Sequence, residues 1–286
     1  MKLGLAITSH AIRNRAALMA ALALGPWLAA VPSARAWGPE GHRIVAHIAE
    51  RRLSEPARAK LAALLTTEQQ LSDNLICNWP DYIRHDRPET GPWHYVDIPY
   101  AKTSYDAERD CPDGQCVVHQ IDALAAVLAD QAAPALKRYE ALCYVVHFVG
   151  DVHQPLHCAD RDGDRGGNLQ LVRYPGEAED TNLHAVWDGT LVRANLGRLG
   201  ALEYADRLND EISWRQARRW ARGTPAEWAL ESHDLAVEFV YAGLPPAGGP
   251  ALELGAAYIT ANRRLVARQL KKAGVRLAEV LDRALQ

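Results

Sequence analysis

The spacing of apolar residues along the chain predicts a protein built almost entirely of helices. Within residues 41–53, Ile44, Val45 and Ile48 recur at the three- and four-residue intervals of an amphipathic helix. Alternation with a period of two, which marks a half-buried strand, is rare. Further helices are predicted after Ser54, where Pro56 fits an early helical position, and at residues 120–132, 136–152, 183–196, 225–241 and 252–273.

The segment 136–152 differs from the other predicted helices because it is mostly apolar. A helix that is apolar all round is buried, so we expect this one at the centre of the fold, ending before Pro155. Strand signals are confined to residues 170–174, which predict half of a short hairpin, while residues 163–167 and 245–250 predict loops. No internal repeat or low-complexity linker interrupts the pattern. The sequence therefore predicts one all-α domain with at most a short β-hairpin.

The N-terminal segment, residues 1–36, has the features of a secretory signal peptide. Arg13 and Arg15 precede an apolar run that is short for a membrane span, and Ala-Arg-Ala at its end has the form of a cleavage site. We therefore expect a mature domain of residues 37–286 that begins with Trp37. Such a protein would be periplasmic or secreted.

The negative net charge of the chain disfavours one class of function, binding of nucleic acid through a basic patch. The formal net charge is −3, and removal of residues 1–36 takes away four basic and no acidic residues, which leaves −7. A chain this acidic is not expected to bind nucleic acid through a basic patch. If its substrate is a polyanion, bound cations must supply the attraction.

Two pairs of potential metal ligands stand at helical spacing. His147 and Asp151 are four residues apart, and so are His184 and Asp188, so each pair lies on one face of a predicted helix. His157 follows the first pair just beyond a proline. Zinc takes histidine nitrogen and carboxylate oxygen, and two such pairs indicate a multinuclear metal site. The full set of candidate ligands from side chains is His42, Asp81, His94, His147, Asp151, His157, His184 and Asp188.

Five cysteines fit an oxidising compartment. Cys111 and Cys116 flank Pro-Asp-Gly-Gln, a natural turn, and are predicted to form a small disulfide loop. The other three, Cys77, Cys143 and Cys158, leave an odd thiol.

These residues resemble the zinc-dependent single-strand-specific nucleases, the type I or S1/P1 family, which share a trinuclear zinc scheme with zinc phospholipase C. The resemblance runs from Trp37 to about Tyr241. The motifs that carry it are Trp37-Gly-x-x-Gly-His42, Trp79-Pro-Asp81-x-x-Arg84, His94-Tyr-Val-Asp97-Ile-Pro, the block from His147 to His157, Gly166-Gly-Asn168 and Asn182-Leu-His184-x-x-Trp-Asp188.

The resemblance implies three Zn²⁺ ions with a ligand set for each. The first would be held by Asp81, His94, His147 and Asp151, and the second by His157, His184 and Asp188. The third would be held by His42, by Asp151 as a bridge, and by the backbone amine and carbonyl of Trp37. A free α-amine titrates near ~7.7–8.0 and becomes a ligand once deprotonated. On this hypothesis the uncleaved precursor cannot complete its third site.

The resemblance also implies roles around the metals. Asp97 would orient or deprotonate the attacking water, and Arg84 would support charge on the phosphoryl oxygens. Tyr95 would stack on an unpaired base, and Asn168 would hydrogen-bond a base edge. The alternatives are a plain salt bridge for Asp97 and Arg84, packing for Tyr95 and a turn for Asn168.

The activity expected from this resemblance is hydrolysis of single-stranded DNA and RNA to 5′-phosphorylated products, with 3′-nucleotidase activity as a further expectation. We expect a monomer. The alternative enzyme is a zinc phospholipase C, which typically carries Glu at the position of Asp188. A zinc-binding protein that has lost catalysis is a third reading, and Arg84 and Asp97 argue against it.

Two smaller hypotheses follow from the implied ligand set. Cys77 and Cys143 each precede a ligand of the first zinc by four residues, so a Cys77–Cys143 bridge is conceivable. His153 stands two residues after Asp151 and points away from it on a helix, where it would serve as a partner of a ligand and not as a ligand itself. His47, His85, His119 and His233 are expected outside the site.

Overall fold

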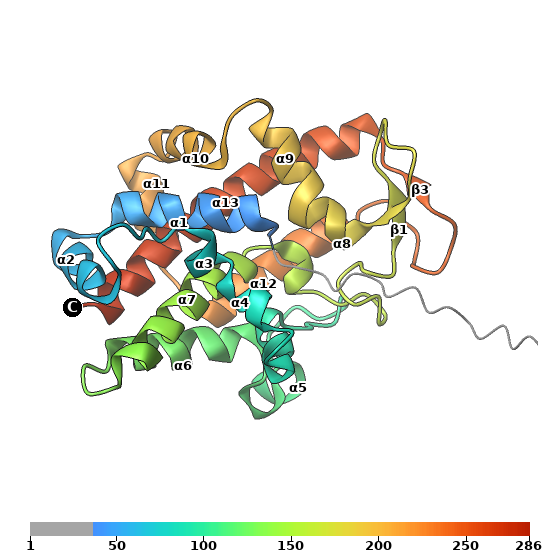
Figure 1. Cartoon of the computed structure of the whole chain (residues 1–286). Helices are drawn as coiled ribbons and strands as arrows, with labels where there is room; N and C mark the ends of the chain where they lie inside the picture. The colour runs from blue at the N-terminus through green and yellow to red at the C-terminus, as the bar shows by residue number, and fades with distance from the viewer. Residues whose placement is uncertain (1–36) are drawn as a thin grey trace, which may run out of the picture. The chain divides into compact units, whose positions relative to one another are not determined.

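The helix α7, Ala135–Asp151, lies at the centre of the fold, and its sequence explains why. Every residue from Ala141 to Asp151 is buried, as expected for a helix that is apolar all round. The protein is described by a computed structural model covering residues 37–286, in which helices dominate, so the prediction of a mainly helical fold is confirmed (Figure 1). The predicted signal peptide, residues 1–36, lies outside the described residues.

The remaining helices pack on α7 or on one another. They are α1 Pro39–Arg52, α2 Glu55–Leu64, α3 Asn74–Cys77, α4 Trp79–Ile83, η1 Pro88–His94, α5 Ala107–Asp110, η2 Pro112–Gly114, α6 Val117–Ala129, η3 Pro155–His157, α8 Leu183–Ala185, η4 Val186–Thr190, α9 Leu191–Leu196, α10 Ala201–Asp210, α11 Trp214–Trp220, α12 Pro225–Leu235, η5 Ala236–Val240 and α13 Ala256–Ala284. Both α1 and α13 pack against α7 and against each other. This packing brings the first and last helices of the described chain together.

Close contact between α1 and α13 depends on a glycine. A side chain at Gly274 of α13 would place its Cβ 2.5 Å from Cβ of Ile48 and 3.2 Å from the carbonyl oxygen of Val45, both in α1. The missing side chain therefore lets the two helices approach more closely than any other residue would allow.

The predicted helix boundaries need several corrections. The segment 120–132 forms a helix that starts earlier, at Val117, and ends at Ala129. The segment predicted at 252–273 becomes helical only at Ala256 and continues to Ala284. The helices α10 and α11 were not predicted, because both are short and rich in charge, which hides an apolar stripe.

The predicted hairpin is present and is joined by a strand that was not predicted. β1, Leu171–Arg173, pairs antiparallel with β2, Thr181–Asn182. β3, Leu252–Glu253, pairs parallel with the other edge of β1 and gives the order β2-β1-β3. A two-residue strand carries too little pattern to be recognised in a sequence.

One cysteine prediction is confirmed and one is wrong. Cys111 and Cys116 form a disulfide. Cys77 and Cys143 are buried free thiols, and burial raises the pKa of each to about 12. Cys158 is also buried, and its thiol donates to the carbonyl of Val152.

No helix among residues 37–286 combines the length and the apolar character that crossing a membrane requires.

Candidate metal centre

Three groups of histidines and aspartates meet beside the C-terminal half of α7. Within each group the potential ligand atoms lie within 4.8 Å of one another. Most of these side chains are almost completely inaccessible to solvent, although none is apolar. The first group is Asp81, His94 and His147; the second is His157, His184 and Asp188; and the third is His42, His147 and Asp151.

The first group has the dimensions of a tetrahedral zinc site. Nδ1 of His94 lies 3.1 Å from Nε2 of His147 and 3.1 Å from Oδ2 of Asp151. Oδ1 of Asp81 lies 3.9 Å from the same His94 atom and 3.8 Å from Nε2 of His147. Ligands at ~2.0–2.2 Å from a tetrahedral zinc are about 3.3–3.6 Å apart. The three side chains of the first group, together with Asp151, therefore surround a space of the right size for this ion.

The second group contains two imidazole nitrogens that face each other without a proton between them. Nδ1 of His157 lies 2.7 Å from the carbonyl of His94, and Nδ1 of His184 lies 2.6 Å from the carbonyl of Gly166. Each Nδ1 therefore carries the proton that it donates, which leaves a lone pair on each Nε2. The two Nε2 atoms are 3.0 Å apart, and Oδ2 of Asp188 lies 3.3 Å from that of His184. Lone pairs at this distance repel each other unless a cation lies between them.

Asp151 connects the first group to the third. Its Oδ2 faces His94 and His147, while its Oδ1 lies 3.3 Å from Nε2 of His42. Trp37 is fully buried, and its indole donates to the carbonyl of Gly150, the residue before Asp151. The backbone amide of the next residue, Gly38, donates to the carbonyl of Asp188. The start of the predicted mature chain is thus fixed among all three groups.

Several buried polar atoms in these groups have no hydrogen-bond partner. A buried polar atom without a partner is uncommon and often marks the position of an ion or a water molecule. Five of the fourteen such atoms among residues 37–286 are on potential metal ligands, and this mixture of nitrogen and oxygen is one that zinc accepts. The atoms are Nδ1 and Nε2 of His42, Nε2 of His94, Oδ1 of Asp81 and Oδ1 of Asp151.

Burial sets the protonation of the groups. It lowers the pKa of His42, His94 and His157 well below the ordinary value, and that of His184 to about 4. The histidines are therefore neutral near pH 7, as ligands must be. Burial, and then the negative charge of Asp81, raises the pKa of Asp151 well above its usual range. A cation would relieve this cost, because it favours the ionised carboxylate.

Local sequence explains how the second i,i+4 pair reaches its position. His184 is in the single turn α8, and the turn that follows, η4, is a π-helix that contains Asp188. The sequence predicted an uninterrupted α-helix here. A π turn carries one additional residue per turn and often occurs at functional sites. On the opposite side, Pro155 begins the short helix η3 that ends with His157.

The residues expected to act on the substrate are more exposed to solvent than most of the candidate ligands. Arg84 is half-buried. Burial is the main cause that lowers the pKa of His157 and His184, and the positive charge of Arg84 lowers both further. Arg84 therefore lies within electrostatic reach of both histidines. Asp97 reaches solvent, yet desolvation, followed by the charges of nearby aspartates, raises its pKa to about 6. Tyr95 is 39% exposed, as a base-stacking residue requires. Asn168 donates one N–H to the carbonyl of Arg165, as a turn residue would, and its Oδ1 atom takes no part in that bond.

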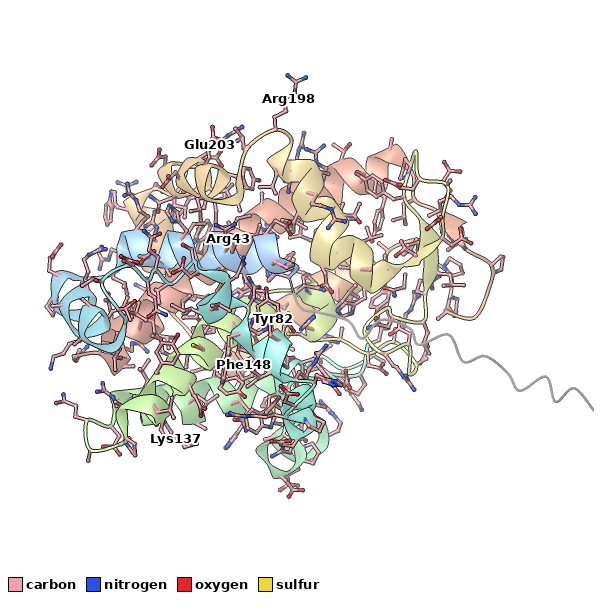
Figure 2. The ribbon with its side chains drawn as sticks, viewed as in Figure 1. Arg43, Tyr82, Lys137, Phe148, Arg198 and Glu203 are labelled. Carbon is pink, nitrogen blue, oxygen red and sulfur yellow. A yellow bond between two sulfur atoms is a disulfide. The ribbon has the colours of Figure 1, made fainter. Side chains whose placement is uncertain are left out.

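Gln154 belongs to the site although the sequence did not predict it, whereas His153 does not assist a ligand as predicted. Gln154 is fully buried and donates to Oδ1 of Asp188 at 2.6 Å, so it orients a potential ligand. Its position inside the motif between His147 and His157 was the available signal. His153 was expected to assist a ligand, but it turns away from the groups and bonds to Val149 and Arg276. Aromatic side chains pack against the first group. One of them is Phe148, whose ring centroid lies 5.0 Å from that of His94 and which lies inside the fold (Figure 2).

The chain is similar in sequence to known nucleases. The sequence model of the family described as S1/P1 Nuclease matches residues 37–286. Endonuclease 2 of Arabidopsis thaliana is 34% identical over 90% of this chain and 93% of its own length. Endonuclease 4 of the same plant is 32% identical over 88% of this chain and 90% of its own length. Nuclease P1 of Penicillium citrinum is 28% identical over 86% and 97%, respectively.

Proposed function

The chain belongs to the S1/P1 nuclease family and is a nuclease, a hydrolase of phosphodiester bonds, and on this premise we propose that it is a trinuclear-zinc endonuclease for single-stranded DNA and RNA. Its products would carry 5′-phosphates, and it would also act as a 3′-nucleotidase. The observation that carries the proposal is that the Nε2 atoms of His157 and His184 lie 3.0 Å apart while both Nδ1 atoms face carbonyl oxygens. Only a cation makes this arrangement favourable.

We assign the three ions to the ligand sets that the resemblance implies. Asp81, His94, His147 and Asp151 would hold the first, and His157, His184 and Asp188 the second. His42, Asp151 and the backbone of Trp37 would hold the third. Support comes from Asp151, whose two oxygens face different groups. When bound, zinc lowers the pKa of water and polarises phosphoryl oxygens.

The chain's own residues would then bind and orient the substrate. Asp97, with a pKa of about 6, is largely ionised at neutral pH and would accept the proton of the attacking water. Arg84 would donate to the non-bridging phosphoryl oxygens, where charge increases during attack. Tyr95 would stack on an unpaired base, which favours single strands, and Asn168 would bond to a base edge.

The organisation of the chain follows from this proposal. Residues 1–36 would be removed as a signal peptide, and residues 37–286 would form the nuclease domain, active as a monomer in the periplasm or outside the cell. Support comes from Trp37, which would be the first residue of the mature chain and is fixed among the candidate ligands.

The proposal is tested by substrate profiling of protein that begins at Trp37. We expect release of 5′-nucleotides from single-stranded DNA and RNA, abolished by a chelator and restored by zinc. Equal rates on duplex DNA would refute the preference for single strands. Release of diacylglycerol from phosphatidylcholine, with no nucleotide release, would instead support the phospholipase C alternative.

A further inference from the structure

We propose that the outer face of α11 is a second binding surface for the single-stranded substrate, distant from the metal ligands. This inference rests on the proposed preference for single strands and extends it. The surface, called the α11 patch below, consists of five side chains that line one shallow hollow. They are Trp214, Arg215, Arg218, Arg219 and Arg222.

The patch exposes the two chemical groups that bind a single strand. Trp214 is 63% exposed, the most exposed aromatic side chain among residues 37–286 and third among all large hydrophobic side chains there. The guanidinium groups of Arg215 and Arg218 lie over its ring, 5.6 and 5.7 Å from the centroid. Bases stack on aromatic rings and on guanidinium planes, and arginines bind the phosphates between them.

The four arginines of the patch are available to phosphates. None has a carboxylate within 4.0 Å among residues 37–286. The acidic residues that flank α11 have other partners. Glu211 pairs with Arg207 and Lys271, and Glu231 pairs with Lys272 and Arg276. The patch therefore carries four positive charges in a chain whose net charge is −3.

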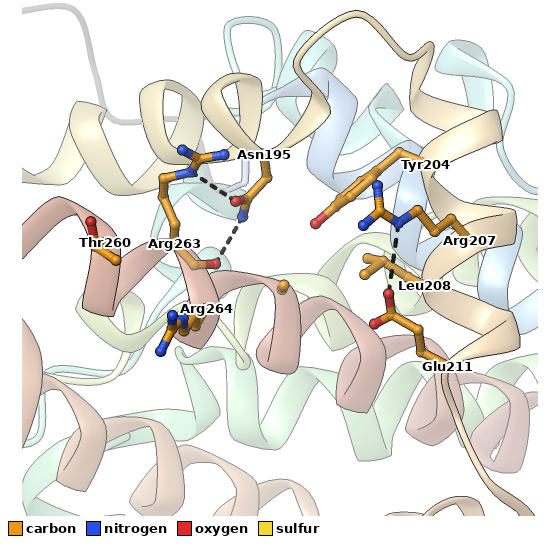
Figure 3. Close-up of a pocket in the computed structure, with 9 residues that line it drawn as sticks. Asn195, Tyr204, Arg207, Leu208, Glu211, Thr260, Arg263 and Arg264 are labelled. Carbon is orange, nitrogen blue, oxygen red and sulfur yellow. Dashed lines mark hydrogen bonds and ion pairs between the residues drawn. The ribbon is translucent and has the colours of Figure 1, made fainter.

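A neighbouring hollow differs from the patch, because two of its arginines have hydrogen-bond or ion-pair partners. Residues of α9, α10 and α13 line a hollow in which Arg263 bonds to the side chain of Asn195 and to the carbonyl of Ala194 (Figure 3). In the same hollow, Arg207 is paired with Glu211. Arg263 thus joins α13 to α9, and Arg207 is paired at the end of its own helix, whereas the arginines of the α11 patch have no carboxylate partner among residues 37–286.

The fold holds the patch in place. Ser213 and Gln216 form a capping box that fixes the start of α11. At its other end Trp220 is buried, and its carbonyl accepts a hydrogen bond from Arg276 of α13. One face of α11 is therefore fixed to the protein, and binding a ligand on the other requires little ordering of the backbone.

The patch is far enough from the metal ligands that only a long substrate reaches both. His42 is in the first turn of α1, while α11 lies toward the end of α1 that carries Arg52 (Figure 1). A helix of 14 residues is about 20 Å long. A dinucleotide at the metal ligands cannot span this distance, and a strand of many nucleotides can.

The first measurement is binding of a fluorescent phosphorothioate oligodeoxythymidylate, which keeps one charge per linkage and resists hydrolysis. We expect Trp214→Ala to weaken binding about fivefold, the low end of base–aromatic stacking. Arg218→Gln/Arg219→Gln should reduce the slope of log affinity against log salt by about 1.4, because each phosphate contact on a single strand contributes ~0.7. The matched control is Lys60→Gln/Arg198→Gln. Both residues are exposed and lie outside the patch, and Arg198 projects into solvent (Figure 2).

The second measurement separates this inference from the proposed function. Hydrolysis of a dinucleoside monophosphate should be unchanged in the patch variants, which also shows that they are folded. If the wild type hydrolyses no dinucleotide, the proposed function is wrong, and the binding assay still decides the role of the patch. The patch proposal is overturned if its variants bind the oligonucleotide like the control. It is also overturned if they lose only the affinity for vesicles of anionic phospholipid, since the patch would then be a membrane contact.

Discussion

At the scale of single residues, Asp151 is the position on which the proposed centre depends most. Its side chain is fully buried, and its two oxygens face different histidines, Oδ2 toward His94 and Oδ1 toward His42. An unpaired carboxylate in such a place would strongly destabilise the fold, which is why its pKa is raised by burial. Cations would turn this cost into a binding interaction.

Asp97 provides the first prediction at this scale. The substitution Asp97→Asn removes the proposed proton acceptor and keeps the shape of the side chain. We expect kcat to fall at least about 100-fold, in the range for loss of a general base. Zinc content, measured by mass spectrometry of the metal, should be unchanged. If the variant retains the wild-type kcat, Asp97 has no role in proton transfer.

The pH dependence of the reaction follows from the same residue. Desolvation, and then the charges of Asp160, Asp164 and Asp110, raises the pKa of Asp97 to about 6. A base acts in its ionised form, so kcat/KM should fall as the pH decreases through that value. Zinc ions bound nearby favour the carboxylate, so the midpoint should lie at or below about pH 6. In Asp97→Asn this acid limb should disappear, and an unchanged pH profile would contradict the assignment.

Gln154 provides a prediction that distinguishes orientation of a ligand from ligation itself. Gln154→Leu keeps the volume of the side chain but removes the donor to Asp188. We expect the affinity of one zinc ion to fall about 10- to 100-fold, as measured by competition with a chelator. The control Gln70→Leu changes an exposed glutamine and should leave all zinc affinities unchanged. Equal affinities in the two variants would contradict the orienting role.

The site could be predicted from sequence only where ligands follow a periodic element. His147 with Asp151, and His184 with Asp188, were recognisable because four residues form one helical turn. The groups that fix the tautomers of the histidines were not recognisable. They are backbone carbonyls of Cys77, His94 and Gly166, whose directions depend on how distant segments fold.

At the scale of elements, predictions from sequence succeeded for long helices with strong patterns. The central helix was predicted at residues 136–152 and is observed at Ala135–Asp151. The π turns η4 and η5 were not predicted, since one additional residue in a turn barely disturbs an apolar pattern. The strand β3 was included in a predicted helix, because tertiary pairing decides the structure of so short a segment.

The contact between α1 and α13 provides a prediction at this scale. In Gly274→Ala the added methyl group would meet Ile48 and the backbone of Val45, neither of which is a flexible chain end. We expect a loss of about 1–3 kcal/mol in the free energy of unfolding, seen as a lower Tm. The control Gly91→Ala adds a methyl group with nothing within 4 Å and should leave Tm nearly unchanged. A Tm of Gly274→Ala as high as that of the control would show that α1 and α13 are less closely packed.

At the scale of the whole molecule, the net charge did not predict the local cluster of positive charge on the surface. The acidic chain was not expected to bind nucleic acid through a basic patch, yet the four arginines of the α11 patch stand together without carboxylate partners among residues 37–286. A sum over the sequence does not show which charges are neutralised by neighbours. The metal ligands and the α11 patch would together attract a polyanion to a chain that repels it elsewhere.

The proposed centre holds three zinc ions in the mature chain, and one of them needs the free amine of Trp37. Native mass spectrometry counts them directly, in a chain that begins at Trp37 and in one with a single alanine before it. We predict three zinc ions on the first chain and two on the second. Three ions on both chains would contradict the role of the amine, and fewer than three on the chain that begins at Trp37 would contradict the proposed trinuclear centre.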